Sequence, residues 1–464
     1  MISRRQFIKY LSYSFIVTKL NPVLADNKKI IKYNIIAKKS KFSFYKNFNA
    51  NLLLYNNLNP GPQLNANVGD VLKIEFTNNL DEPTSIHWHG IKNINKMDGV
   101  PYLTQDPIQP GETFSYEFPI NHSGTYWYHA HFESWQQVAR GLYGPLIIKD
   151  KIDDNFDDDI VILADDWRLN KNYQIDEKSF GSLRDWSHAG RIGNWFTING
   201  EKSPEYKISK NGLTRLRFIN ASNARVLKFR SSLNNNKIIA VDGMIVEPFR
   251  EETFTIGPGQ RIDLLLDTVD ISKVDYFEIS NKNPLKAFSL KVKKANTKNR
   301  KFTKINLSPN YNLPKLNKAK TINIHMQGGA MGNLTKAKID GVEKDFRALA
   351  MEDKKLWAFN KEIGNYEKLL SSVKKDDVVI LNVWNDTRWP HSMHLHGHHY
   401  FVNSNEFTNY NNYLLRDTYL IQPNEKSKLI FLADNPGKWL FHCHMLEHAA
   451  SGMVNYIKVT SIIF

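Results

Sequence analysis

The only cysteine of this 464-residue chain, Cys443, stands among side chains that can bind a metal. It is the centre of His442-Cys443-His444, and His448 and Met453 follow shortly after it. A single thiol cannot form an intrachain disulfide, and a lone cysteine is most often a small apolar residue of a protein core. Two imidazoles, one thiolate and a weak thioether are nevertheless the ligands of a blue-copper electron-transfer site. The segment therefore predicts copper, provided that a further histidine arrives from elsewhere in the chain.

Four His-x-His pairs supply further metal-binding side chains. They are His87/His89, His129/His131, His394/His396 and His442/His444. On a strand, residues two positions apart face the same side, so each pair would direct both rings toward one place. One such pair is more often structural, but eight imidazoles could not be buried together without a cation to bind. Imidazole is a ligand for copper, zinc and iron alike.

Short β-strands must position these histidines. Residues 71–77 and 114–118 alternate apolar and polar side chains, which is typical of half-buried strands, and stretches with helical periodicity are few. A strand that ends in asparagine occurs three times, and an Ile-x-Pro turn follows each one in the same order. The asparagines are Asn78, Asn220 and Asn385, and the turns begin at Ile108, Ile256 and Ile421. The repeats predict three homologous β-sandwich domains.

The first and third repeats share a further match that the second lacks. Residues 87–90 mirror residues 394–397, and residues 124–131 mirror residues 437–444. Ala130 stands in the place of Cys443, so the first repeat keeps the imidazoles without the thiolate. We expect the outer repeats to carry the metal chemistry and the middle repeat to act as a spacer without copper. The expected domains span residues 26–150, 155–297 and 318–464.

The N-terminal segment resembles a bacterial twin-arginine export signal. Ser3-Arg4-Arg5-Gln6-Phe7-Ile8-Lys9 precedes a short apolar stretch, and Val23-Leu24-Ala25 offers a small-residue cleavage site. We therefore expect a signal at residues 1–25 and a periplasmic mature protein exported by the twin-arginine route, with a basic tail as the alternative. No run of about 18 apolar residues occurs later, so no integral membrane segment is expected in the mature chain.

The net charge of +15 comes from lysines and arginines that are scattered along the chain. No run of them resembles a nucleic-acid-binding tail, so a solvated basic surface is the simpler interpretation and no nucleic acid partner is expected. A hydrophobic content of 41% fits a globular protein of several domains. Three domains in one chain make a monomer sufficient.

In these motifs the chain resembles the multicopper oxidases. The resemblance rests on His87-Trp88-His89-Gly90, His129-Ala130-His131, His391-Ser392-Met393-His394-Leu395-His396, and His442-Cys443-His444 with His448 and Met453. It covers nearly the whole mature chain and implies an all-β fold of three consecutive cupredoxin-like Greek-key β-sandwich domains. It also implies four copper ions as cofactors: one of type 1, one of type 2 and two of type 3.

The resemblance assigns every copper ligand by its position in the motifs. It places His391, Cys443 and His448 on the type 1 copper with Met453 as axial ligand, and His87 and His394 on the type 2 copper. It places His89, His129 and His444 on one type 3 copper, and His131, His396 and His442 on the other. Cys443 would then be catalytic as well, because it joins the type 1 copper through its sequence neighbours to the trinuclear cluster.

The activity implied by the resemblance is that of an exported multicopper oxidase. Such an enzyme couples one-electron oxidation of a phenol-type reductant or Cu(I) at the type 1 copper to four-electron reduction of O2 to water at the trinuclear cluster. A laccase-like enzyme and a cuprous oxidase both fit. The alternative is a periplasmic copper-binding, copper-tolerance protein with incidental oxidase activity.

Two acids and one missing acid bear on the movement of protons. Asp98 is expected to be a catalytic proton relay beside the cluster, with an ordinary Asp-Gly turn as the alternative. Ala449 stands where some family members carry a glutamate, which leaves the second proton path open. Asp417 would either accept a proton from the substrate near the type 1 site or pair with its neighbour Arg416.

The methionines bear on the identity of the reductant. Soft thioether clusters are expected of a dedicated cuprous oxidase, yet the chain has nine methionines and no methionine-rich insert. The nearest grouping is Met326 and Met331 with Met351, which forms either a weak Cu(I) entry site or an ordinary loop. The sequence therefore leaves the electron donor open.

Overall fold

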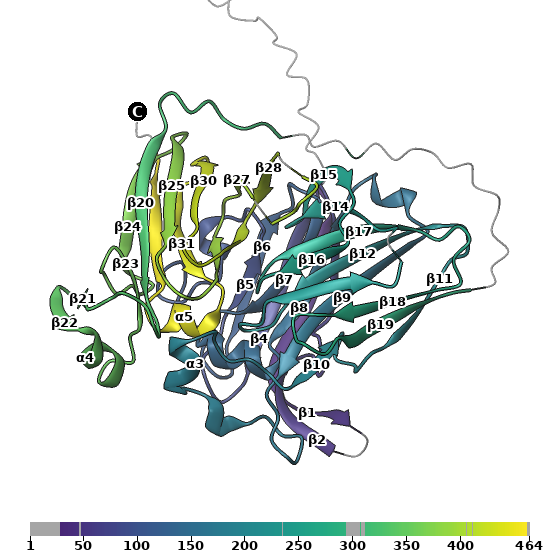
Figure 1. Cartoon of the computed structure of the whole chain (residues 1–464), viewed down its shortest axis with the longest axis horizontal. Helices are drawn as coiled ribbons and strands as arrows, with labels where there is room; N and C mark the ends of the chain where they lie inside the picture. Colours follow the sequence, from purple (N-terminus) through teal and green to yellow (C-terminus); the bar gives the residue numbers. More distant parts are fainter. Residues whose placement is uncertain are drawn as a thin grey trace, which may run out of the picture.

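The chain folds into three β-sandwiches that follow one another in sequence (Figure 1). The computed structural model describes residues 28–45, 48–233, 235–293, 307, 311–404, 406–410 and 412–461. The predicted all-β fold of three cupredoxin-like units is confirmed. The expected export signal, residues 1–25, lies outside the described residues, and the expected domain boundaries stay predictions. No helix of the described ranges is long and apolar enough to cross a membrane.

The first sandwich pairs two four-stranded sheets, with strand orders β2-β1-β4-β6 and β3-β8-β7-β5. Its elements are β1 Ile30–Tyr45, β2 Phe48–Tyr55, β3 Leu64–Asn67, β4 Val71–Asn79, β5 Ile86–His89, η1 Asn95–Met97, β6 Thr113–Pro119, β7 Gly124–Ala130, α2 Ser134–Gln137, η2 Val138–Arg140 and β8 Tyr143–Lys149. The predicted alternation is confirmed, because Leu72, Ile74 and Phe76 of β4 turn toward the core. In β6, Tyr116 and Phe118 pair with them and face the same way.

The second sandwich pairs a six-stranded and a five-stranded sheet, with orders β10-β9-β12-β17-β14-β15 and β11-β19-β18-β13-β16. Its elements are η3 Asp153–Asn155, β9 Asp158–Trp167, η4 Glu177–Ser179, α3 Leu183–Ser187, β10 Trp195–Ile198, β11 Glu205–Ile208, β12 Leu213–Asn220, β13 Leu227–Ser231, β14 Lys237–Val241, β15 Met244–Phe249, β16 Thr253–Ile256, β17 Arg261–Asp267, β18 Lys273–Glu278 and β19 Leu285–Val292. Apolar side chains from both sheets share one core, which includes Phe218 of β12 and Phe229 of β13.

The third sandwich repeats this plan, with orders β23-β20-β25-β30-β27-β28 and β24-β32-β31-β26-β29, and carries the hairpin β21-β22 outside it. Its elements are β20 Lys320–Gly328, β21 Lys336–Ile339, β22 Val342–Asp345, α4 Phe346–Met351, β23 Trp357–Phe359, β24 Leu369–Lys374, β25 Val378–Asn385, β26 His391–Leu395, β27 Tyr400–Asn403, β28 Tyr413–Arg416, β29 Thr418–Ile421, β30 Lys426–Leu432, β31 Gly437–Cys443, α5 Leu446–Ala450 and β32 Val454–Thr460. Cys443 and Met453 both belong to its core.

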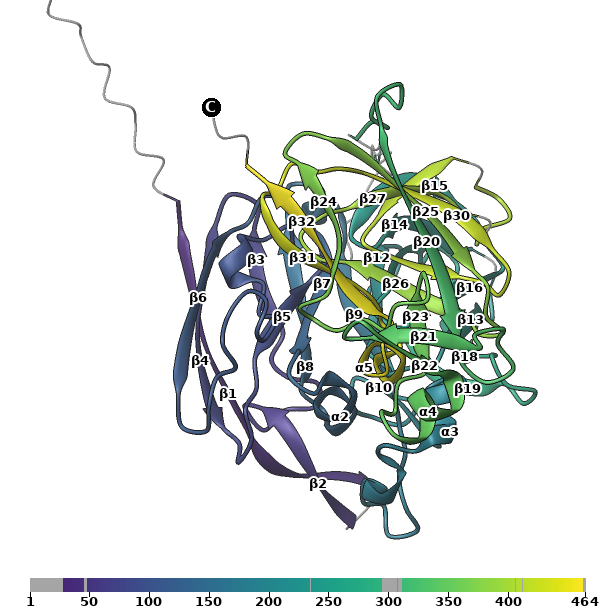
Figure 2. The same ribbon diagram turned by 90° about the vertical axis from the view of Figure 1, so that its left-hand side faces the viewer.

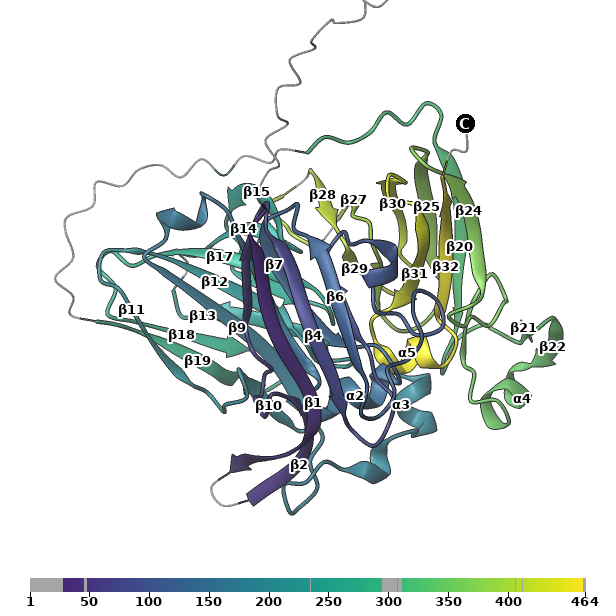
Figure 3. The same cartoon turned by 180° about the vertical axis from the view of Figure 1, so that it is seen from behind.

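The three sandwiches meet one another rather than forming a string. Seen from behind, the purple and blue strands of the first unit stand between the teal second unit and the green and yellow third unit (Figure 3). The view turned by 90° shows the first and third units side by side (Figure 2). Helix α5 of the third unit contacts α2 of the first and α3 of the second. Residues far apart in sequence can therefore share one site.

The two repeated sequence anchors are joined by hydrogen bonds in every sandwich. The buried asparagine at the strand end donates its side-chain amide to the carbonyl of the isoleucine that opens the Ile-x-Pro turn. These bonds are Asn78 to Ile108 at 2.9 Å, Asn220 to Ile256 at 2.8 Å and Asn385 to Ile421 at 3.2 Å. The two repeated sequence anchors therefore mark one structural feature, a hydrogen bond between the end of a strand and a later turn of the same sandwich. We call this bond the asparagine latch.

Replacement of Asn78 by alanine tests this latch. Asn78 is fully buried, donates to the carbonyl of Glu82 as well and accepts the N–H of Leu80, so Asn78→Ala would leave the Glu82 carbonyl and the Leu80 N–H without these partners. We expect a loss of about 2–3 kcal/mol in the free energy of unfolding, measured by denaturant titration of the copper-free protein. Asn79→Ala, at the exposed neighbouring position, is the matched control and should change the free energy little. Equal losses in the two variants would contradict the latch.

Candidate metal centre

Two pairs of neighbouring strands bring the predicted histidines together between the first and third sandwiches. In the first, β5 pairs with β7 and places His87 opposite His129. In the third, β26 pairs with β31 and places His394 opposite His442 in the same way. The ring of His87 stacks on that of His396, with centroids 3.8 Å apart, so histidines of the two sandwiches touch. The two outer repeats thus face each other across one buried volume.

Buried ligand atoms within 4.8 Å of one another form five groups among the described residues. The groups are His87/His89/His394, His89/His129/His444, His131/His396/His442, His391/Cys443/His448 and His87/Asp98/His396. Every histidine of the four His-x-His pairs belongs to at least one group, and we call these eight residues the histidine cluster. The group around Cys443, which we call the cysteine site, lies in the third sandwich alone.

Ring nitrogens in the histidine cluster show whether a cation would fit there. The Nδ1 atoms of His87 and His394 hydrogen bond to the backbone carbonyls of Asp98 and Asp417, both at 2.8 Å. The Nε2 atoms of the same two rings are buried and have no hydrogen-bond partner. A buried nitrogen without a partner is costly, and metal-binding histidines usually donate their other N–H to a carbonyl or carboxylate. The pair therefore fits a metal ion.

Two further pairs of rings present their Nε2 atoms to each other. The distance is 3.1 Å between His396 and His442 and 3.4 Å between His129 and His444. His442 and His129 use Nδ1 for the carbonyl of the next residue, at 2.9 and 3.0 Å. Their Nε2 atoms then carry lone pairs that face a neighbouring nitrogen, an arrangement that suits a shared cation.

Burial keeps most imidazoles of the cluster neutral. Desolvation is the main cause, and it lowers the pKa of His442 to about 4. It lowers the pKa well below the ordinary value of 6.5 for His89, His129, His131, His394, His396 and His444. Neutral imidazole is the form that binds metals, so protons compete little for these nitrogens near neutral pH.

The cysteine site has the donor set of a copper–thiolate centre. The Cys443 Sγ lies 3.6 Å from the Nδ1 of His391 and 3.8 Å from the Nδ1 of His448, and these two nitrogens are 3.1 Å apart. Burial raises the pKa of the Cys443 thiol to about 12, so a metal ion that binds the thiolate would have to displace its proton. Met453 is fully buried, and its carbonyl accepts the N–H of Cys443 at 3.0 Å.

Both histidines of the cysteine site have their outer nitrogens occupied. The Nε2 of His391 lies 2.9 Å from the Oγ1 of Thr387, and the Nε2 of His448 donates to the carbonyl of His188 at 2.7 Å. His448 is fully buried. The ring of Trp357 packs on it with centroids 4.3 Å apart. These partners fix the rings so that both Nδ1 atoms face Cys443.

Asp98 reaches the histidine cluster and also ends a helical turn. It follows η1, as the Asp-Gly interpretation expects, and its N–H bonds back to Asn95. Its carboxylate lies 2.8 Å from the Nδ1 of His396 and 3.3 Å from the Nδ1 of His87. The Oδ1 atom is buried without a hydrogen-bond partner. Asp98 can thus be a turn residue and also lie beside the histidine cluster, so the turn and the expected proton relay do not exclude each other.

The expected pairing of Asp417 with Arg416 is wrong. The Asp417 carboxylate accepts two hydrogen bonds from Arg261, at 2.7 and 2.5 Å, whereas Arg416 bonds to Asp242 and Glu406. Arg416 ends β28, and Asp417 is the bend residue between β28 and β29, where its carboxylate turns toward Arg261 instead. Asp417 is also 1% exposed, which excludes direct contact with a reductant in solution. Arg261, aided by the Thr418 hydroxyl, holds the pKa of Asp417 below its usual value despite burial.

The middle sandwich reaches both sites, although it contributes no member of the five groups among the described residues. The carbonyl of His188 contacts His448 of the cysteine site, and Arg261 contacts Asp417 beside the histidine cluster. Its expected role as a spacer is therefore incomplete. Sequence patterns carried no signal for these contacts, because a carbonyl has no side-chain signature and Arg261 pairs across 156 residues.

The remaining metal-binding candidates of the sequence are dispersed. Met326 is fully buried in the core, while Met331 and Met351 are 68% and 66% exposed, so the three do not form one exposed Cu(I) site. His398 is buried beside Trp439, and His325 bonds to Asp386. An ordinary loop is the interpretation that fits Met331.

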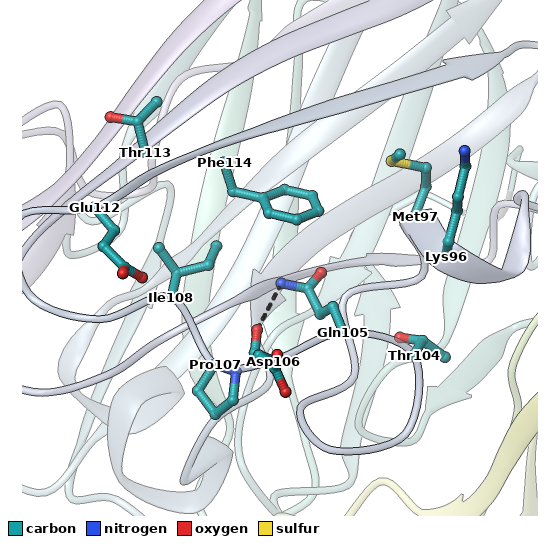
Figure 4. Close-up of a pocket in the computed structure, with 10 residues that line it drawn as sticks. All are labelled: Lys96, Met97, Thr104, Gln105, Asp106, Pro107, Ile108, Glu112, Thr113 and Phe114. Carbon is teal, nitrogen blue, oxygen red and sulfur yellow. Dashed lines mark hydrogen bonds between the residues drawn. The ribbon is translucent and has the colours of Figure 1, made fainter.

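Two cavities open near the cluster. One of about 440 Å³ lies on the first sandwich, and Figure 4 shows Met97, Gln105 and Phe114 in its lining. Met97 directly precedes Asp98, but no lining residue belongs to the five groups. The other, of about 520 Å³, lies where the three sandwiches meet and is lined in part by Tyr366. The ring of Tyr366 lies 5.5 Å from that of His131.

Three family profiles, each described as multicopper oxidase, match this chain. They match residues 37–153, 158–307 and 340–461, which together are most of its length. The multicopper oxidase mco of Staphylococcus haemolyticus is 30% identical over 448 residues, covering 94% of this chain and 90% of that protein. The multicopper oxidase MmcO of Mycobacterium tuberculosis is 27% identical, covering 86% of this chain and 82% of that one.

Solved structures extend the likeness to three dimensions. A multicopper oxidase of Campylobacter jejuni, described as a metallo-oxidase, superposes with a TM-score of 0.78 at 27% identity and covers 93% of this chain and 92% of that one. A multi-copper oxidase of Pseudomonas thermotolerans has the same TM-score and identity and covers 93% of this chain and 100% of its own. Because three family profiles match most of the chain and a relative is 30% identical over nearly all of it, the chain belongs to the multicopper oxidases, a family of oxidoreductases.

Proposed function

We propose that the protein oxidises a small reductant by one electron at the cysteine site and reduces O2 to water at the histidine cluster. The observation that carries the proposal is the course of β31. Cys443 belongs to the cysteine site, while His442 and His444 on either side belong to two different groups of the histidine cluster. A few covalent bonds therefore join the place where one electron would enter to the place where four would be used.

The proposed ligand assignment follows the groups of the structure. Type 1 copper would be held by His391, Cys443 and His448 with Met453 as axial ligand, type 2 copper by His87 and His394, and the type 3 pair by His89, His129 and His444 and by His131, His396 and His442. Copper bound there would supply the one-electron redox steps and the reduction of O2. The chain keeps most of the rings neutral, fixes the orientation of several through carbonyl partners and excludes water by burial.

Asp98 is proposed as the group that supplies protons at the cluster. Its carboxylate faces the Nδ1 atoms of both His396 and His87, so it can hold a proton beside two rings of the histidine cluster. The neighbouring carbonyl of the same residue fixes His87. Ala449 has no acidic side chain, so it cannot serve as a second proton donor. Asp98 is therefore the candidate for proton donation at the histidine cluster.

The burial of His448 favours a small electron donor. Its outer nitrogen bonds to the carbonyl of His188, so a bulky phenol cannot hydrogen bond to this ring as the chain is folded. An electron from a metal ion at the surface needs only to pass His188, which covers this nitrogen and is itself partly exposed. We therefore favour Cu(I) or a similar reducing metal ion over a phenol. The name metallo-oxidase given to the similar Campylobacter jejuni protein is in keeping with this choice.

The proposed place of action is the periplasm, reached by the twin-arginine route. The support is the pattern Ser3-Arg4-Arg5-Gln6-Phe7-Ile8-Lys9 with its cleavage site before Asp26. A monomer there would suffice, and a role in copper tolerance would follow from oxidation of Cu(I). Recovery of a mature chain that begins at Asp26 from the periplasmic fraction would support this location, and an intact cytoplasmic chain would count against it.

Replacement of Asp98 by asparagine tests the proton role. The amide oxygen of the Asp98→Asn variant keeps an acceptor for His396, but the amide cannot take up and release a proton as a carboxylate does. We therefore expect the rate of O2 consumption to fall about 100-fold at unchanged copper content. Asp106→Asn, at an exposed position of the same loop, is the control and should keep the wild-type rate. A fully active Asp98→Asn enzyme would leave Asp98 as a turn residue only.

A comparison of electron donors tests the proposed activity and its substrate class together. We expect the copper-loaded enzyme to consume one O2 per four Cu(I) oxidised, without release of peroxide. The kcat/KM for Cu(I) or Fe(II) should exceed that for dimethoxyphenol by about tenfold or more, because the cover over His448 excludes the phenol. Faster oxidation of the phenol would overturn the substrate class, and no O2 uptake with any donor, Mn(II) included, would overturn the oxidase itself.

A further inference from the structure

Arg261 stands where all three sandwiches meet. Its Nε donates to the carbonyl of Thr125 in β7 of the first sandwich, at 3.0 Å. Within the second sandwich it donates to the carbonyls of Gly259 at 3.1 Å and Asp242 at 2.9 Å. Its two Nη atoms grip the carboxylate of Asp417, which directly precedes β29 of the third sandwich. The guanidinium is fully buried, and its five N–H groups are all used.

The partners of Arg261 lead directly to the histidine cluster. The Asp417 carboxylate lies 3.2 Å from the Nε2 of His89, and the Asp417 carbonyl lies 2.8 Å from the Nδ1 of His394. His89 then has Nδ1 as its remaining nitrogen, and that atom is buried without a partner. Asp417 and the hydroxyl of Thr418, which donates to Asp417 at 2.7 Å, thus orient one histidine from the first sandwich and one from the third. Arg261 holds Asp417, which contacts both histidines.

The backbone beside Arg261 also packs closely against the histidine cluster. Gly259 has a φ of +83°, and a Cβ added there would come within 2.9 Å of the His444 ring and 3.0 Å of the His89 ring. Only a glycine allows the middle sandwich to approach so closely. Thr125, the partner in the first sandwich, lies on the same strand as His129. The middle sandwich therefore touches the cluster from a third side.

We propose that Arg261 is a positioning residue for the histidine cluster, through which the middle sandwich controls how tightly copper binds between the outer two. The inference rests on the proposed function for the identity of the metal. A planar guanidinium can hold a carboxylate with two bonds and three carbonyls with the other three N–H groups at once, and an ammonium cannot. The hydrogen bonds of Arg261 reach none of His391, Cys443 and His448, so the cysteine site has no direct contact with this junction.

The separation of the two sites gives the experiment a sharp readout. In Arg261→Met we expect the blue absorption of the copper–thiolate site to remain, while copper at the histidine cluster binds 10–100-fold more weakly in chelator competition. The paramagnetic signal of the type 2 copper should be lost first, because Asp417 contacts His394. Arg261→Lys should regain part of this affinity, since it restores the charge without the planar fork.

Arg215→Met is the matched control. Arg215 is a buried arginine of the same sandwich that pairs with Asp153 and Asp263, and neither partner contacts a histidine of the cluster. Cluster copper bound equally well in Arg261→Met and Arg215→Met would overturn the proposal. If Arg261→Met does not fold, wild-type affinity in Arg261→Lys would overturn it instead. A wild-type protein without copper at the cluster would refute the proposed function, whatever Arg261 does.

Discussion

The burial of eight imidazoles between two β-sandwiches is the constraint on which the rest of the structure depends. Desolvation lowers the pKa of most of these rings far enough that they stay neutral. Neutral rings packed against one another leave nitrogens such as the Nε2 atoms of His87 and His394 without partners. A fold that gathers such atoms is stable only if something offsets their desolvation, and a cation does so directly. The stability of the fold and the binding of a cation are therefore coupled in this chain.

Strand geometry places the buried histidines in the same way in the first and in the third sandwich. The pairing of β5 with β7 and of β26 with β31 presents histidines in the same register, and the asparagine latches hold each sandwich to the same plan. The third sandwich differs by its cysteine site, whose thiol stands at the position where the first has Ala130. Because side chains on opposite faces of a strand point apart, Cys443 and its neighbour His442 belong to two different sites although both lie on β31.

Much of this arrangement could be predicted from sequence because it follows from short-range periodicity and from repeats. The alternation of Leu72, Ile74 and Phe76, the His-x-His pairs and the repeated asparagines all follow from a period of two or from repeat spacing. The contacts of Asp417 could not be predicted. Pairing with its neighbour Arg416 is one of two expectations, yet Asp417 lies in the bend between β28 and β29 and a guanidinium 156 residues away binds its carboxylate. Contacts between sandwiches depend on how the sandwiches pack against one another, and this packing produces no periodic pattern in the sequence.

The oxygen uptake of copper-loaded Cys443→Ser protein tests the central claim most directly, namely that β31 links electron entry to O2 reduction. Serine keeps the strand and both neighbouring histidines but removes the thiolate. The account predicts that the variant keeps copper at the histidine cluster, loses the blue absorption and consumes O2 at least about 100-fold more slowly with every donor. Oxygen uptake at the full wild-type rate, with the cluster loaded and the blue band gone, would contradict it.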